Sequence, residues 1–172
     1  MIVAQMLKYV DATTPVRFLI AECETSFTLL TALYFAKLFG VEDKIDISPL
    51  FETDVALIRG HKVIEEVLEN PRYREYVKNR GRLCIQTGFS DAGRYLGQVA
   101  ATLSIENLHL NIGRVLARHG LEGVQLIIFD THGESIGRGG HPVSLVDRLH
   151  YLASPYSRQK FEDSHLSFKE AI

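Results

Sequence analysis

The stretch that decides the fold is residues 124–129, which read Val-Gln-Leu-Ile-Ile-Phe. A continuous apolar run of this length indicates a β-strand that is buried on both faces. A polar, glycine-rich segment, residues 130–141, follows it directly, and an expected helix begins at Pro142 and runs to about Leu152. Strand, loop and helix in this order make up one unit of an α/β protein.

Three similar units precede this one in the chain. Each has a short apolar run followed by a longer segment with helical periodicity. The helix expected in the third unit holds three glycines, which indicates close packing or a kink. The pattern predicts an α/β fold of four consecutive strand–helix units with parallel strands. The expected strands are 16–21, 45–51 and 83–88, and the expected helices are 27–39, 55–68, a short one at 73–78, and 92–119.

Length and composition limit the classes of protein to consider. The chain has 172 residues, enough for a single domain 1–172, whose core we place at about 16–152. The polar tail, 153–172, is expected to be less ordered. A net charge of −2 argues against a nucleic-acid partner. The chain has no apolar run long enough to span a membrane and no signal pattern at its start, so we expect a cytoplasmic protein.

The two cysteines, Cys23 and Cys84, both lie in apolar runs. We expect buried free thiols in a reducing compartment. A disulfide or a metal pair is the alternative, although no Cys-x-x-Cys spacing supports it.

Acidic side chains follow two of the expected strands. Glu52 comes directly after the second strand, and Asp91 follows the third. In parallel α/β folds, ligand-binding groups lie on the loops at the carboxyl ends of the strands. Two such carboxylates could share Mg²⁺, which uses one or two carboxylates and completes its shell with water and substrate oxygens. The alternative is that each is a helix cap or a first-turn acid that the helix dipole favours.

The loop after the fourth strand has the composition of an anion site. Residues 133–140 read Gly-Glu-Ser-Ile-Gly-Arg-Gly-Gly. Glycines such as Gly137, Gly139 and Gly140 let backbone N–H groups approach an anion closely. Arg138 adds a fork of donors that suits phosphate or carboxylate. The loop matches neither the Walker pattern nor the dinucleotide fingerprint, and a flexible glycine turn remains the alternative.

Two further side chains could act at the same place. Arg94 lies one helical turn beyond Asp91 and could direct a second cation at the same pocket, or it could be a solvated helix residue. His132 and His141 stand on either side of the glycine-rich loop, and either could carry a proton or contact a phosphate. A loop histidine without a catalytic role is the more ordinary interpretation.

Three of these strand-end segments resemble phosphoenolpyruvate carboxylases. Residues 49–53 resemble that family's P-L-F-E-T segment, and residues 88–94 resemble G-Y-S-D-S-x-K. Residues 129–140 resemble F-H-G-R-G-G-[ST]-[IV]-G-R-G-G. The three motifs occur in the family's order, and the resemblance covers roughly residues 16–142.

The resemblance implies a fold, which is about half of a TIM-type (β/α)₈ barrel, and it also implies an enzymatic activity. The family carboxylates phosphoenolpyruvate with bicarbonate, using Mg²⁺ or Mn²⁺, to give oxaloacetate and phosphate. Glu52 and Asp91 are then the implied metal ligands. The implied catalytic residues are Arg138, Arg94 and His132. The residues that the resemblance implies bind the phosphate are Arg138, Arg94, Gly137, Gly139 and Gly140.

The chain also departs from the family pattern. The family's lysine is Arg94 here, its first loop arginine aligns with His132, and its next glycine pair becomes Gly133-Glu134. The family's Thr-Ala-His-Pro-Thr motif, which carries the catalytic histidine, does not occur in this sequence. A diverged homologue that binds a phosphorylated or acidic metabolite is therefore an alternative.

Four strands cannot close an eight-stranded barrel. We therefore expect a fragment, one piece of a split enzyme, or a homologue that pairs with itself. The expected partners are the missing portion of the barrel or a second copy of the chain. We also expect exposed apolar surface and a homo-oligomer.

Overall fold

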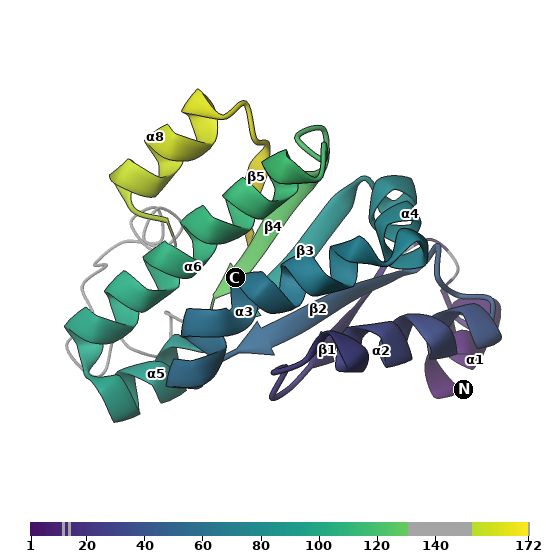
Figure 1. The fold of residues 1–172 in the computed structure, drawn as a ribbon. Coiled ribbons are helices and arrows are strands. Elements are labelled where there is room, and N and C mark those ends of the chain that lie inside the picture. The colour runs from purple at the N-terminus through teal and green to yellow at the C-terminus, as the bar shows by residue number, and fades with distance from the viewer. Residues whose placement is uncertain (12, 14, 131–152, 172) are drawn as a thin grey trace.

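The structure is a computed structural model that describes residues 1–11, 13, 15–130 and 153–171. Its centre is a single sheet of five parallel strands in the order β1-β2-β3-β4-β5 (Figure 1). The strands are β1 (Val16–Ile20), β2 (Ile45–Phe51), β3 (Arg82–Thr87), β4 (Gln125–Asp130) and β5 (Phe168–Ala171). The helices are α1 (Ile2–Tyr9), α2 (Ser26–Leu38), α3 (Asp54–Glu69), α4 (Pro71–Arg80), α5 (Phe89–Leu96), α6 (Gln98–Arg118) and α8 (Pro155–Asp163).

The predicted parallel α/β fold is confirmed. β1 to β4 lie where the sequence predicts strands, and every neighbouring pair is parallel. The apolar run of β4 is buried as expected, with Leu126, Ile127 and Ile128 all in the interior. None of the described helices is both long and apolar enough to cross a membrane.

The structure differs from the sequence-based expectation at the tail. Instead of a less ordered segment, residues 155–163 form α8 and residues 168–171 form a fifth strand, β5, paired with β4. Phe161 and Leu166 anchor this tail because both are buried in the main core. The sheet therefore has five strands rather than four.

The helix expected at 92–119 is interrupted at one of its glycines, in agreement with the expected kink. The structure divides it into α5 and α6 at Gly97, which has a φ of 84°. This left-handed backbone favours glycine and cannot continue an α-helix. The division points α5 toward the carboxyl ends of β2 and β3, while α6 runs back along the sheet (Figure 1).

The capping residues explain why α3 and α4 begin where they do. Thr53 caps α3, and its side chain accepts a hydrogen bond from the N–H of Ala56 at 3.1 Å. Asn70 caps α4 in the same way, with Pro71 at the first helical position. Both arrangements satisfy N–H groups that a helix start leaves without partners.

Helices α2, α3, α6 and α8 lie in front of the sheet in Figure 1, and the main core fills the space between them and the strands. The opposite face, which we call the inner face, is curved. The guanidinium of Arg17 on β1 lies 5.2 Å from the centroid of the Phe129 ring on β4, although β2 and β3 separate the two strands. A flat sheet would keep β1 and β4 about 14 Å apart. The sheet curves as part of a barrel does, with the inner face on the concave side and the helices on the outside.

The cysteines fulfil the expectation of buried free thiols. Burial raises the pKa of Cys23 and of Cys84 to about 11 in each case. Neither thiol is therefore a ready nucleophile at neutral pH.

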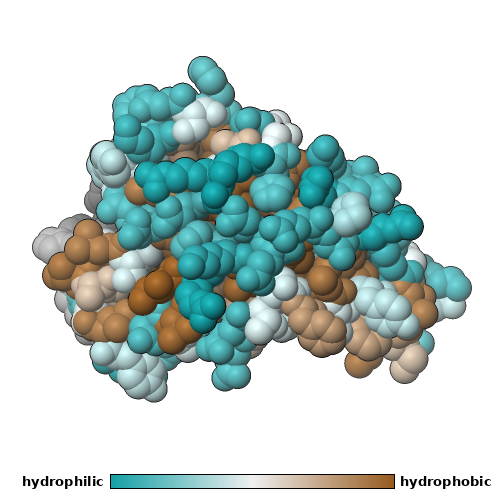
Figure 2. All heavy atoms as spheres, in the orientation of Figure 1, coloured by the Kyte–Doolittle hydropathy of each residue, from teal (hydrophilic) through white to brown (hydrophobic). Residues whose placement is uncertain are grey.

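Exposed apolar surface, which the sequence led us to expect, gathers over α1 and α2 (Figure 2). Phe18 and Leu19 of β1 are also exposed, on a strand that pairs within the described residues only with β2. The exposed large side chains on α1 and α2 include Ile2, Met6, Tyr9, Phe27, Tyr34, Phe35 and Leu38.

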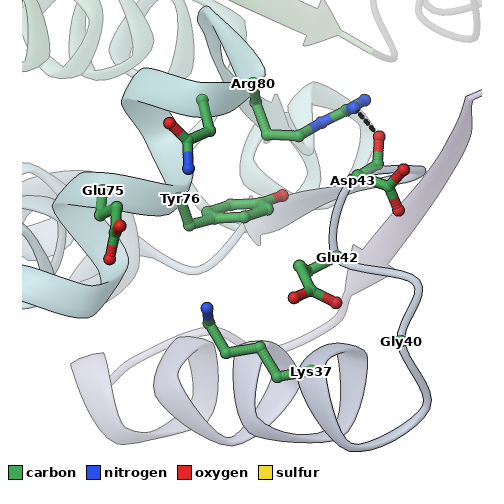
Figure 3. Close-up of a pocket in the computed structure, with 8 residues that line it drawn as sticks. Lys37, Gly40, Glu42, Asp43, Glu75, Tyr76 and Arg80 are labelled. Carbon is green, nitrogen blue, oxygen red and sulfur yellow. Dashed lines mark hydrogen bonds between the residues drawn. The ribbon is translucent and has the colours of Figure 1, made fainter.

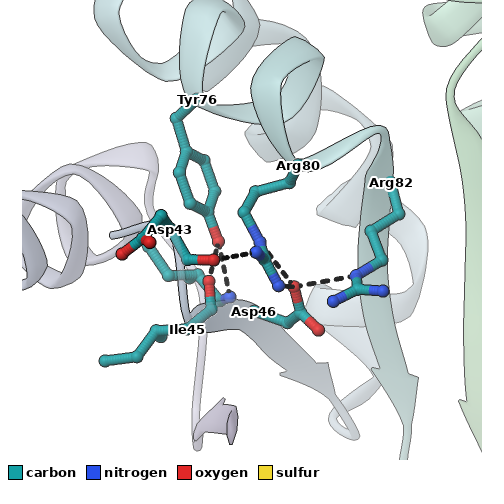
Figure 4. A network of polar contacts seen from close by, with 7 residues as sticks. Asp43, Ile45, Asp46, Tyr76, Arg80 and Arg82 are labelled. Atoms are coloured by element: carbon teal, nitrogen blue, oxygen red, sulfur yellow. Dashed lines mark hydrogen bonds and ion pairs between the residues drawn. The ribbon is translucent and has the colours of Figure 1, made fainter. Parts of the chain in front are cut away.

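Two polar features lie at the amino-terminal end of the strands. Asp46 of β2 accepts hydrogen bonds from Arg80 and Arg82 (Figure 4). Beside it, a cavity of about 440 Å³ opens between the end of α2 and α4, with the Tyr76 ring at its centre (Figure 3). The cavity lies at the opposite end of β2 from Glu52, so we do not assign it to the site predicted from sequence.

A candidate metal site at the ends of β2 and β3

The carboxyl ends of β2 and β3 lie side by side and bring two predicted site residues together. Phe51, the last residue of β2, is in register with Thr87, the last residue of β3. The N–H of Gly88 then donates to the carbonyl of Phe51 at 2.9 Å. Glu52 follows β2 directly, and Asp91 lies in the first turn of α5, which begins at Phe89.

Gly88 leaves room for Glu52. A Cβ atom at position 88 would lie 2.4 Å from the Cβ of Glu52 and 3.3 Å from its Oε2. No other residue type fits beside this carboxylate without moving it. The backbone φ of Gly88 is −91°, so glycine is needed here for space rather than for backbone conformation.

Asp91 faces both a carboxylate and a cation. Its side chain lies near enough to the Glu52 carboxyl group to raise the pKa of Glu52. Arg94 Nη1 donates to Asp91 Oδ1 at 2.9 Å. The structure thus brings Glu52, Asp91 and Arg94 together, as the sequence predicts, and the roles assigned to them stay predictions.

The surroundings of Glu52 disfavour the ionised form of its carboxyl group. Burial raises the pKa of Glu52, and the neighbouring charge of Asp91 raises it further. A raised carboxyl pKa beside a second carboxylate is typical of sites that bind a cation or move a proton.

Sequence reasoning missed the contribution of Glu22. Its negative charge raises the pKa of Glu52, while its nearby backbone N–H lowers that pKa by a smaller amount. Glu22 has a φ of 49°, a left-handed backbone that costs free energy for a residue other than glycine. Its position directly after β1 was the available signal, because the ends of parallel strands share one edge of the sheet.

The residues present fit a divalent cation with few protein ligands. Within the described part of the chain, no group of three or more His, Cys, Asp or Glu side chains converges as a metal cage. Two adjacent carboxylates are nevertheless what Mg²⁺ commonly takes from a protein. A cation there would also remove the repulsion that raises the pKa of Glu52.

The glycine-rich loop lies outside the described residues, together with His132, Gly137, Arg138, Gly139, Gly140 and His141. The backbone of β4 leads toward it from Asp130, which is in register with Thr87. The predicted anion site on this loop therefore stays a prediction.

The raised pKa of Glu52 leads to a prediction on stability. In the metal-free chain, the folded state holds a proton on Glu52 at pH values where the unfolded state has released it. Stability should therefore fall as the pH rises from the usual glutamate range through the raised pKa. We expect Glu52→Gln to be more stable than the unmodified chain at neutral pH and to lose this advantage in acid. Urea titrations in EDTA across this pH range measure the difference; a constant difference would contradict the prediction.

Parallel strands that carry paired carboxylates at their carboxyl ends define an α/β protein of the class that binds ligands at that edge of the sheet. The family model for phosphoenolpyruvate carboxylase matches residues 2–146. The chain belongs to the phosphoenolpyruvate carboxylase family.

Individual relatives agree with this assignment. The chain is 30% identical over 125 residues to a phosphoenolpyruvate carboxylase of Marinomonas sp. (strain MWYL1), a match that covers 73% of the chain and 14% of the relative. It is 33% identical over 116 residues to that of Hahella chejuensis, with 67% and 13% covered. It is 30% identical over 144 residues to that of Mycobacterium avium, with 78% and 15% covered. The chain thus spans about a seventh of the length of these relatives.

Proposed function

We propose that this chain provides the metal-binding and phosphate-binding face of a phosphoenolpyruvate carboxylase, which converts phosphoenolpyruvate and bicarbonate to oxaloacetate and phosphate. The observation that supports this most directly is the register of Phe51 with Thr87, which places Glu52 and Asp91 next to each other at the ends of β2 and β3. Family membership supports it independently.

Each residue has a distinct role in this proposal. Glu52 and Asp91 hold Mg²⁺ or Mn²⁺, and the ion supplies positive charge that stabilises phosphoryl and enolate oxygens. Arg94 orients Asp91 through its hydrogen bond, and its remaining N–H donors are available to a bound anion. Arg138 and the glycines of its loop bind the phosphate, and His132 takes part in proton transfer.

The chain alone is proposed to bind ligands without completing the reaction, because the sequence has no Thr-Ala-His-Pro-Thr motif. The remaining portion of the barrel or a second copy would pair along β1, whose Phe18 and Leu19 are exposed. His132 and Glu134 differ from the family pattern and support a second candidate, a homologue that binds another phosphorylated or acidic metabolite.

Calorimetry with Mn²⁺ tests the metal site. We expect the chain to bind Mn²⁺, and we expect Glu52→Gln and Asp91→Asn each to weaken binding by about tenfold or more, because each removes a charged ligand. Glu75→Gln on α4, an exposed carboxylate of the same type, should leave Mn²⁺ binding unchanged.

A second titration, with phosphoenolpyruvate in the presence of Mn²⁺, separates the two candidate functions. Phosphoenolpyruvate should bind more tightly than other phosphate esters if the carboxylase assignment is right, and Arg138→Ala should weaken its binding. Tighter binding of another phosphate ester would favour the diverged homologue. Mn²⁺ binding that survives both carboxylate substitutions would contradict the metal site itself.

A further inference from the structure

The outer edge of β1 is open, although the strand has the sequence of an interior strand. β1 pairs only with β2 among the described residues, and its sequence, Val-Arg-Phe-Leu-Ile, is apolar except for the arginine. Phe18 lies on the helix side of the sheet, in register with Ile47 of the main core, and Leu19 lies on the inner face. Both side chains are exposed. Parallel strands of this composition are normally covered on both faces, so this edge lacks a partner.

The exposed apolar surface continues from β1 onto α1 and α2 (Figure 2). Six aromatic side chains there are between 40% and 74% exposed, and they are Tyr9, Phe18, Phe27, Tyr34, Phe35 and Phe39. At about 150–250 Å² for each whole side chain, these six alone expose about 500–850 Å². The largest apolar patch of a monomer is about 300–600 Å², and a stable interface buries about 800 Å² on each partner. The surface is therefore large enough for a stable dimer.

The same surface has the shape and the charge that self-association needs. A hollow of about 240 Å³ lies between α1, α2 and β1, and every residue that lines it is apolar. Exposed aromatic side chains of α2 lie beside it. A twofold interface needs both a hollow and projecting groups on one surface, because each copy presents the same patch. Lys37 is the only charged residue of α2, so like charges oppose the approach of a second copy only weakly.

Two edge strands of a second copy could pair with β1, and β1 of that copy fits better than β5. β5 has only four residues, and two of them, Lys169 and Glu170, are charged in sequence. Short strands that carry charged residues resist edge pairing. Pairing of β1 with β1 also closes after two chains, whereas pairing of β1 with β5 would continue from chain to chain.

The backbone of β1 limits the register of such a pair. The N–H of Val16 donates to the carbonyl of Lys44 at 2.8 Å, so the backbone groups of Val16 point toward β2. The direction alternates along a strand, and the groups of Phe18 therefore also point toward β2. Those of Arg17 and Leu19 point to the open edge, where they can pair with another strand.

We propose that two copies of this chain form a twofold dimer by antiparallel pairing of their β1 strands about Phe18. Arg17 of each copy exchanges two backbone hydrogen bonds with Leu19 of the other, and the two Phe18 side chains lie opposite each other. Other twofold registers place Arg17 opposite Arg17, where like charges repel, or pair fewer residues. None of these contacts involves Glu52 or Asp91, so the dimer does not rest on the proposed carboxylase function.

The same pairing covers the exposed helices. α1 lines a second hollow together with the segment 39–44 that precedes β2, so it lies at the amino-terminal end of the sheet. Phe27 lies in the first turn of α2, which follows the carboxyl end of β1. Antiparallel pairing places the amino-terminal end of one copy beside the carboxyl end of the other. α1 of each copy therefore meets the start of α2 in the partner.

A cysteine cross-link tests the contact and its register together. In the proposed dimer the two Cα atoms at position 18 are about 4.5 Å apart, which a disulfide can bridge. The two Cα atoms at position 19 are about 8 Å or more apart, because they are offset by two residues along the strands, and a disulfide cannot bridge them. With oxidised glutathione, Phe18→Cys should give a covalent dimer and Leu19→Cys should not. The native cysteines are buried and should not compete.

Sedimentation equilibrium with the whole chain measures the association itself. We expect monomers and dimers without larger species. Leu19→Pro removes a donor at the open edge but none from the pairing of β1 with β2, so it should weaken dimerisation by about tenfold or more. Phe27→Glu should do the same if proline disturbs β1, and circular dichroism verifies that each variant is folded. Tyr156→Glu, on α8 at the far side of the sheet from β1 (Figure 1), is the control and should dimerise as the unmodified chain does.

Three results would overturn the proposal. A chain that stays monomeric at high concentration would show that a second copy does not cover this face. Association into species larger than a dimer would show head-to-tail pairing of β1 with β5. Equal cross-linking of Phe18→Cys and Leu19→Cys would contradict the register.

Discussion

Replacing Gly88 with alanine is expected to weaken Mn²⁺ binding by about tenfold to a hundredfold, which is the range for losing the support of a metal ligand. The added Cβ would lie 2.4 Å from the Cβ of Glu52. That atom is fixed by the backbone of Glu52, so no rotation of the side chain relieves the contact. The end of β2 must separate from the start of α5, and Glu52 then moves away from Asp91. Calorimetry with Mn²⁺ measures the loss.

Gly93→Ala is the matched control, because Gly93 lies within α5, the helix that begins directly after Gly88. Its added Cβ would meet nothing closer than 3.7 Å, at the ring of Phe89. Alanine is also the better helix former, so α5 should be unchanged or slightly more stable. If Gly88→Ala binds Mn²⁺ as the unmodified chain does, Glu52 is not held in place by this contact.

The sequence was sufficient to predict the helices and strands that have a clear hydrophobic periodicity or a clear terminating residue. Apolar runs located β2, β3 and β4, and the family motifs located Glu52 and Asp91 at their ends. The contact between the two carboxylates could not be predicted, because it depends on the register of Phe51 with Thr87 and on the missing side chain of Gly88.

Elements without such a signal were missed. β5 has four residues, and Lys169 and Glu170 interrupt its apolar character. Its position depends on the pairing with β4 and on the burial of Phe161 and Leu166. Glu22 was overlooked for a related reason. Its part in the site comes from a backbone N–H and an unusual φ, which the residue type does not reveal.

Replacing Asp46 with alanine is expected to destabilise the chain by about 3 kcal/mol or more, the cost of removing one partner of a buried ion pair. The Asp46 side chain is 8% exposed, and those of Arg80 and Arg82 are 11% and 28% exposed. Oδ1 of Asp46 accepts from both guanidinium groups, at 2.5 Å from Arg80 Nη2 and 3.0 Å from Arg82 Nε. Without it, two largely buried cations face each other and nearby Arg17. Urea denaturation measures the change.

The cost should come mainly from the unpaired cations rather than from the lost hydrogen bonds. Asp46→Ala combined with Arg80→Met should therefore be less destabilised than Asp46→Ala alone, because the double substitution removes one of the cations and fills its space. Asp163→Ala on α8 is the control. Its pairing with Lys160 is 3.7 Å long and about half exposed on both sides, so its loss should change stability by less than about 0.5 kcal/mol. A double variant as unstable as the sum of its two single variants would show that the hydrogen bonds, not the charges, hold this end of the sheet together.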